Sequence, residues 1–135
     1  MILVDSSVWV DYFNGVDTPQ TDRLFALVNR SELLIGDLIM IEVLQGFYRQ
    51  RDFDWALSEF RLIGSLVILD TYVARQGAVN YRALRTKGIT VRKTIDTLIA
   101  TRCIIDDIAL LHSDRDFLPF VEHLGLRDAM DEVVL

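Results

Sequence analysis

The 135-residue chain contains one cysteine, two histidines and two prolines. A single cysteine excludes an internal disulfide framework and a multi-thiolate metal site, and two histidines argue against a histidine-rich zinc site. No apolar run approaches the ~20 residues of a membrane span. The first residues lack the basic lead and the cleavage site of a secretory signal, so we expect a cytoplasmic protein with no membrane partner.

The composition is that of a folded protein. Hydrophobic residues make up 51% of the chain and charged residues 25%, which is enough apolar surface to bury a core. A chain of this length fits one domain, so we expect residues 1–135 to form a single domain.

Acidic residues exceed basic ones by 20 to 14, for a net charge of −6. By itself this excess argues against a nucleic-acid partner, because phosphate binding depends on basic residues. Between Arg82 and Lys93, however, there are five basic residues and no acid. This stretch is either a solvated helix end or a local strip of phosphate contacts. Bound metal cations would partly neutralise the acidic excess.

Short apolar runs alternate with segments of helical periodicity. Strands are predicted at residues 1–4, 33–35, 66–69 and 108–111. Helices are predicted at 8–14, from 19 through Val28, at 38–49, 53–63 and 71–86, from Thr94 to Cys103, and at 117–123. The tail, 124–135, has no clear pattern. Continuous apolar strands separated by helices predict an α/β fold with a central parallel sheet of four to five strands, flanked by helices.

The helix starts carry recognisable capping residues. Ser6 or Ser7 is a predicted N-cap of the first helix, Asp37 of the helix that follows the second strand, and Thr94 of the last long helix.

Five acids fall where such a fold places its site, at the carboxyl ends of the strands. Asp5 ends the first strand, and Asp114 and Asp116 follow the fourth; Glu42 and Asp96 lie near helix starts. Each has a structural explanation as a cap, a helix-dipole partner or a turn residue. Glu42 is the hardest to explain so, because a carboxylate within an apolar stretch is costly unless paired or coordinated.

Taken together, these acids point to metal chemistry. Four or five carboxylates on one edge, without as many cations, repel one another unless metal ions lie among them. Ligation by oxygen alone favours Mg²⁺ or Mn²⁺ over zinc. A pair of such ions can activate water and stabilise the leaving oxygen of a phosphodiester.

Four segments resemble the motifs of PIN-domain proteins, and of the VapC toxins among them. They are MILVDSSVWV at residues 1–10, MIEVLQG at 40–46, TIDTLIA at 94–100 and LHSDRDF at 111–117. They occur in the family's order and span nearly the whole chain. The resemblance implies a three-layer PIN-like domain and a Mg²⁺- or Mn²⁺-dependent endoribonuclease. It also implies the toxin half of a toxin–antitoxin pair, a homodimer and inhibition by a cognate antitoxin.

The resemblance also assigns site residues. It carries over Asp5, Glu42, Asp96 and Asp114 as the acidic metal site, with Asp116 as an additional acid and Ser7 and Ser113 as hydroxyl residues beside the acids. On this basis we expect Asp5, Asp96 and Asp114 to be the direct metal ligands, and Glu42 to complete the shell or position the water. Asp116 would hold a second, weaker ion.

The RNA itself needs cations near these acids. We expect Arg92, Lys93 and Arg115 to contact its phosphates, although Arg115 has the alternative of pairing with the aspartates on either side of it.

A rival hypothesis is a non-catalytic PIN-like interaction module. In it the acids only cap helices, and a partner helix binds the early aromatic residues, which are Trp9, Tyr12, Phe13, Phe47, Tyr48, Phe53 and Trp55. Such a module would be indifferent to EDTA. A phospho-acceptor receiver domain is disfavoured, because Asp5 lacks the adjacent acid that receivers carry after the first strand.

Overall fold

The computed structural model describes residues 1–27 and 32–132. These residues form a parallel sheet of four strands in the order β3-β2-β1-β4. The strands are β1 (Ile2–Val4), β2 (Leu33–Gly36), β3 (Gly64–Leu66) and β4 (Ala109–Leu111). An isolated parallel bridge between Leu110 and Asp128 adds a further segment beside β4. The predicted parallel sheet of four to five strands is confirmed.

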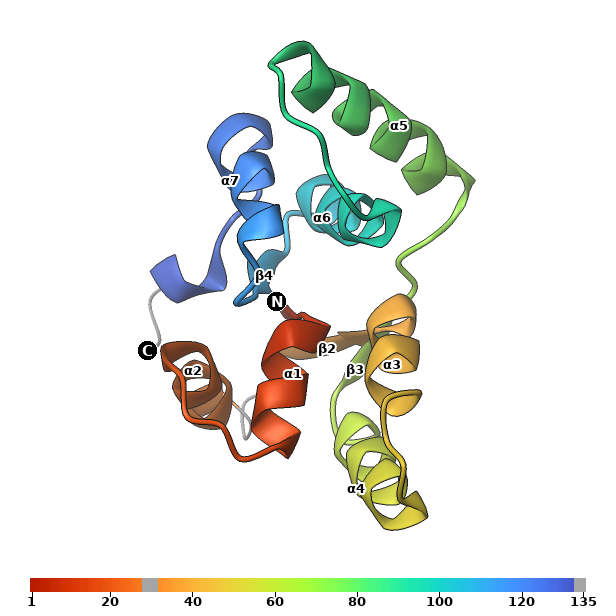
Figure 1. Ribbon diagram of the computed structural model, residues 1–135, viewed down its shortest axis with the longest axis vertical. Helices are drawn as coiled ribbons and strands as arrows, with labels where there is room; N and C mark the ends of the chain where they lie inside the picture. The colour runs from red at the N-terminus through yellow and green to blue at the C-terminus, as the bar shows by residue number, and fades with distance from the viewer. Residues whose placement is uncertain (28–31, 133–135) are drawn as a thin grey trace.

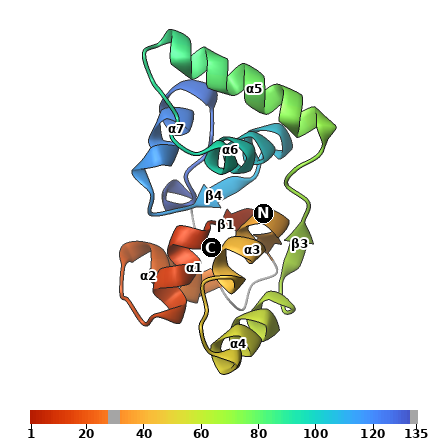
Figure 2. The same ribbon diagram turned by 45° about the vertical axis from the view of Figure 1, so that its right-hand side comes forward.

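Helices cover both faces of the sheet (Figure 1). The α-helices are α1 (Ser6–Phe13), α2 (Pro19–Leu27), α3 (Asp37–Leu44), α4 (Gln50–Phe60), α5 (Thr71–Thr86), α6 (Thr94–Asp106) and α7 (Leu118–Leu124), and two 3₁₀ turns are η1 (Arg115–Phe117) and η2 (Ala129–Asp131). Figure 2 shows α1–α4 on one side of the strands and α5–α7 on the other, which gives three layers. Among the helices of the described residues, none is long and apolar enough to cross a bilayer.

The third strand lies two residues earlier than predicted. The sequence placed it on the apolar residues 66–69, but Gly64 pairs with Leu34 and Leu66 with Gly36. Packing explains the shift, because a Cβ on Gly64 would come within 2.9 Å of the Leu34 side chain. The apolar residues after the strand serve another purpose: Ile68 is fully buried against Gly36, where any Cβ would overlap it.

Helix boundaries also differ from the predictions. The helix expected at 38–49 ends at Leu44, after which the chain turns and Phe47 packs edge-on against Phe13. The next helix therefore begins at Gln50 rather than residue 53, and it ends at Phe60. Val28 and the last three residues of the tail lie outside the described residues.

The caps predicted for α1, α3 and α6 are each displaced by a residue or two. Asp5, rather than Ser6 or Ser7, caps α1. Asp37 and Thr94 are the first residues of α3 and α6, whose N-caps are Gly36 and Lys93.

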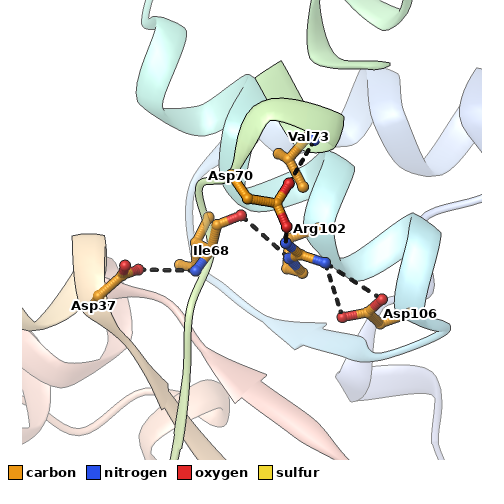
Figure 3. Close-up of polar contacts among 6 residues, drawn as sticks. All are labelled: Asp37, Ile68, Asp70, Val73, Arg102 and Asp106. Atoms are coloured by element: carbon orange, nitrogen blue, oxygen red, sulfur yellow. Dashed lines mark hydrogen bonds and ion pairs between the residues drawn. The ribbon is translucent and has the colours of Figure 1, made fainter. Parts of the chain in front are cut away.

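One polar network holds the crossover from β3 to α5 (Figure 3). Ile68 donates its N–H to Asp37 Oδ1 at 2.9 Å, and its carbonyl accepts from Arg102 Nε at 3.1 Å. Arg102 Nη2 also donates to Asp70 Oδ2 at 2.8 Å, while Asp70 Oδ1 caps α5 by accepting from Val73 N–H. Residues of α3, the crossover and α6 are thereby joined at a single peptide segment.

Candidate metal centre at the carboxyl end of the sheet

The centre is built first from the ends of the neighbouring strands β1 and β4. Asp5 follows β1, is 3% exposed, and accepts through Oδ2 from the Ser7 backbone N–H at 3.0 Å and from the Ser7 hydroxyl at 2.6 Å. Ser7 Oγ in turn accepts from the Ser113 N–H at 3.1 Å, just beyond β4. Ser7 thus orients the first acid and ties the two strand ends together. Ser113 contributes its backbone to this chain of bonds.

A cluster of three carboxylates adjoins these strand ends. Asp96, Asp114 and Asp116 each present an oxygen that lies within 4.8 Å of the oxygens of the other two. The first turn of α6 supplies Asp96, and Asp114 is fixed as the N-cap of η1 by accepting from Asp116 N–H at 2.9 Å. Their separation is short enough for all three to reach one cation.

Asp96 is the least satisfied of these acids. It is 6% exposed, and its Oδ2 has no hydrogen-bond partner in the described part of the chain. Burial, followed by the charges of Asp5 and Asp114, raises the pKa of Asp96 to about 7, against the opposing charge of Lys93. An acid so placed is either protonated or neutralised by a cation, because a bare buried carboxylate is costly.

Glu42 and Asp5 extend the acidic region beyond that cluster. Glu42 projects from α3 with a buried Oε1 that lacks a partner among the described residues. Burial and then the Asp5 charge raise the pKa of Glu42, while the Ser6 side chain and Lys93 oppose the shift. Burial also raises the pKa of Asp5. Both residues are coupled electrostatically to Asp96, although neither belongs to the group within 4.8 Å.

The three residues expected to bind phosphates, Arg92, Lys93 and Arg115, differ in how they interact with the acids. Arg92 Nη2 lies 3.0 Å from both oxygens of Asp116, with the Arg92 side chain 76% exposed. Lys93, the N-cap of α6, acts on Asp96 and Glu42 through its charge. Arg115 is exposed and forms no ion pair within residues 1–27 and 32–132, so its alternative role as a partner of the flanking aspartates is not seen.

Sequence reasoning missed the contacts that His112 makes. Its ring is 5% exposed and packs on Phe117, with Nε2 3.5 Å from Asp128 Oδ2. A cleft of about 360 Å³ beside Asp114 is lined by His112 and Asp128 together with Arg115 and Gln20. The partner Asp128 lies in the tail, whose sequence has no periodic pattern, so no local spacing could have indicated the pair.

The aromatic residues of the rival hypothesis differ in exposure, and Tyr12, Phe13, Phe47 and Phe53 are half-buried. Trp9 is 2% exposed, stacks on Phe13 and meets Phe60 edge-on, so it belongs to the core. Tyr48 and Trp55 are exposed. Only part of the predicted aromatic surface is therefore available to a partner.

The donor set fits a hard divalent cation. Every ligand within reach is a carboxylate oxygen, and two buried oxygens, one on Asp96 and one on Glu42, lack partners in the described residues. Carboxylate oxygens suit Mg²⁺ and Mn²⁺, whereas zinc sites ordinarily include nitrogen or sulfur ligands. The arrangement can thus hold a cation where a phosphate oxygen would otherwise be repelled.

Comparisons with known proteins bear on the family and on the fold. The PIN domain family model matches residues 2–120. The VapC ribonuclease Mb1587 of Mycobacterium bovis is 31% identical over 119 residues, which cover 87% of this chain and 89% of that protein. Among solved structures, VapBC2 from Rickettsia felis bound to a promoter DNA fragment aligns with a TM-score of 0.73 at 17% identity, covering 94% of this chain and 96% of the other. A toxin–antitoxin complex from Klebsiella pneumoniae aligns with a TM-score of 0.71 at 14% identity, covering 98% and 100%.

Proposed function

The chain belongs to the PIN-domain family, and from that premise we propose that it is a metal-dependent endoribonuclease and the toxin of a toxin–antitoxin pair. The ribonuclease named among its relatives and the fold shared with a toxin–antitoxin complex support both parts of the proposal. One observation carries it: the buried Asp96 carboxylate, with an unpartnered oxygen within the described residues, faces two further carboxylates.

In this proposal Asp96 and Asp114, with Asp5, hold the principal cation, Mg²⁺ or Mn²⁺, and Asp116 holds a second, weaker one. A bound divalent ion supplies Lewis-acid stabilisation of the phosphodiester and a lowered pKa for water. Glu42 would accept a hydrogen bond from a bound water through Oε1, which has no partner among the described residues.

The remaining site residues position these acids or bind the RNA. The Ser7 hydroxyl keeps Asp5 oriented through the 2.6 Å bond, and the Ser113 N–H keeps Ser7 in place. Arg92, Lys93 and Arg115 bind the phosphates on either side of the scissile bond.

The same proposal assigns a protein partner. An apolar groove of about 570 Å³ runs between α3 and the edge strand β3, with Met40, Ile41, Leu44 and Phe53 among its lining residues. A groove of this kind suits an apolar segment of a cognate antitoxin. We also propose a homodimer, which light scattering on the purified protein would test.

Cleavage assays on the purified protein test the enzyme. A mixed single-stranded RNA is incubated with Mg²⁺, with Mn²⁺ and with EDTA. Cleavage should require the metal and fall to background in Asp96→Asn, because the substitution removes an anionic ligand without changing the shape of the side chain. The matched control is Asp106→Asn, on the same helix but paired with Arg102, which should cleave like the parent. Metal-independent cleavage, or an active Asp96→Asn protein, would contradict the proposal.

A further inference from the structure

The distribution of charge along the chain is strongly uneven. Residues 71–95 contain six basic residues and no acid, whereas the segments before and after them each carry a net charge of −6. The six residues form what we term the basic strip: Arg75, Arg82, Arg85, Lys87, Arg92 and Lys93. Such a run in an acidic protein repels itself unless it faces solvent or an anion.

The structure exposes the whole basic strip on α5 and on the loop that leads to α6. All six residues are exposed, and within the described chain only Arg92 forms an ion pair. Arg75 and Arg82 are seven residues apart on α5, so they share a helix face with a rise of about 10 Å between them. Arg85 follows one turn later, and Lys87 begins the loop that leads to Lys93 beside the acids. The basic strip therefore ends at the candidate metal centre.

A groove lies beside the part of the basic strip that belongs to α5. It lies between α5 and α6, has a volume of about 300 Å³, and includes Tyr81, Arg82, Thr94 and Leu98 in its walls. Thr94 begins α6, two residues before Asp96. Buried Gly77 lies where α5 packs on α6, next to Leu98 and Thr97. The Arg85 guanidinium lies 5.8 Å from the centroid of the Tyr81 ring.

An aromatic ring, cations and apolar walls are the features with which proteins bind unpaired nucleotides. We propose that α5 and the loop to α6 form the path along which a single strand of RNA reaches the acids. One base lies in the groove against Tyr81, and the phosphates lie along Arg75, Arg82 and Arg85. This inference rests on the proposed ribonuclease function and adds the surface on which the substrate is held.

The size of the groove favours a single strand over a duplex. Its volume of about 300 Å³ has room for about one unpaired base. Binding by the strip should also be sensitive to salt, because each phosphate neutralised on a single strand contributes about 0.7 to the log–log salt slope.

The test measures binding without catalysis. Fluorescence anisotropy follows a labelled 12-nucleotide single-stranded RNA in EDTA, over a series of salt concentrations, with the parent and with the triple variant Arg75→Gln, Arg82→Gln, Arg85→Gln. The matched control replaces Arg49, Arg51 and Arg61, which are exposed at the two ends of α4 and change the net charge equally. The strip variant should bind about a hundredfold more weakly at 0.1 M salt, and its salt slope should fall by about 2. The control should keep more than half of the parent's affinity.

Three results would overturn the inference: equal losses in the two triple variants, tighter binding of a duplex of the same sequence, or a change of oligomeric state in place of RNA affinity. Metal-dependent cleavage by the parent is measured separately. If the parent cleaves RNA and the strip variant binds it normally, the inference fails while the proposed function stands. If the parent protein binds RNA through the basic strip but does not cleave it, the proposed function fails while the binding surface stands.

Discussion

Two groups of carboxylates in this molecule have opposite surroundings. Around Arg102, the acids Asp70 and Asp106 pair with its guanidinium, and Asp37 accepts two backbone N–H groups. At the carboxyl end of the sheet, Asp96 and Glu42 each keep a buried oxygen without a partner in the described chain. The first arrangement satisfies its charges and joins helices. The second leaves them unsatisfied, which folding alone would not favour and which a bound cation would correct.

The pKa shifts separate the same two groups. The Val73 N–H and then the Arg102 guanidinium hold the pKa of Asp70 below its ordinary value. Burial and neighbouring carboxylates move the pKa of Asp96 the other way. An aspartate that is easy to ionise therefore belongs to the architecture, and one that is hard to ionise marks the candidate site.

Removing Arg102 should give the largest loss of stability. Its side chain is 11% exposed, and Arg102→Met would leave the Ile68 carbonyl without its donor and the crossover without its link to α6. We expect the free energy of unfolding to fall by about 2 kcal/mol in urea denaturation. The matched control is Arg127→Met, because Arg127 also binds two carboxylates and a carbonyl but is 41% exposed; it should lose less than about 1 kcal/mol. Equal losses in the two variants would show that the burial of Arg102 adds nothing to the stability its contacts provide.

Ser7 and Ser113 test how Asp5 is held at the candidate metal centre. Ser7→Ala removes the hydroxyl that orients Asp5, so Mn²⁺ affinity measured by calorimetry should fall about tenfold. Ser113→Ala keeps the backbone N–H that reaches Ser7, so its Mn²⁺ affinity should match the parent. A larger loss in Ser113→Ala than in Ser7→Ala would show that the hydroxyl of Ser113 has a role the hydrogen bonds do not indicate.

The smallest expected effect is on stability against pH without metal. The folded pKa of Asp96, about 7, exceeds its ordinary value of 3.8, so the folded state holds the proton more tightly. Its contribution to stability is therefore present at acidic pH and lost as pH rises from about 4 to 7. After solvent screening, EDTA-treated protein should be about 1 kcal/mol less stable at pH 8 than at pH 5. Asp96→Asn should reduce this difference; an unchanged pH profile in the variant would contradict the assignment.

The positions of Asp5 and Asp114 at strand ends could be predicted from the sequence, whereas several strand and helix boundaries could not. Asp5 and Asp114 could be placed because each follows an apolar strand, and parallel strands end at a common edge. The third strand was misplaced because its pairing residues, Gly64 and Ser65, have low β-propensity and are selected by their fit against β2.

The links from Arg102 to Ile68 and Asp70 gave no signal in the sequence, because these partners lie more than thirty residues away and meet Arg102 only in the folded chain. The same applies to His112 and Asp128. Neighbour spacing reveals residues that share an element, whereas contacts between elements depend on how those elements pack.

The exposed cations of α5 have a practical consequence for handling the protein. The amino-acid sequence corresponds to a pI of about 4.8, so isoelectric focusing should show an acidic protein. A charged chromatography matrix binds a protein through a local surface rather than through its net charge. The surface that carries Arg75, Arg82 and Arg85 is locally cationic. Phosphocellulose or heparin columns should therefore retain this protein at neutral pH, although its negative net charge alone predicts that it would not bind.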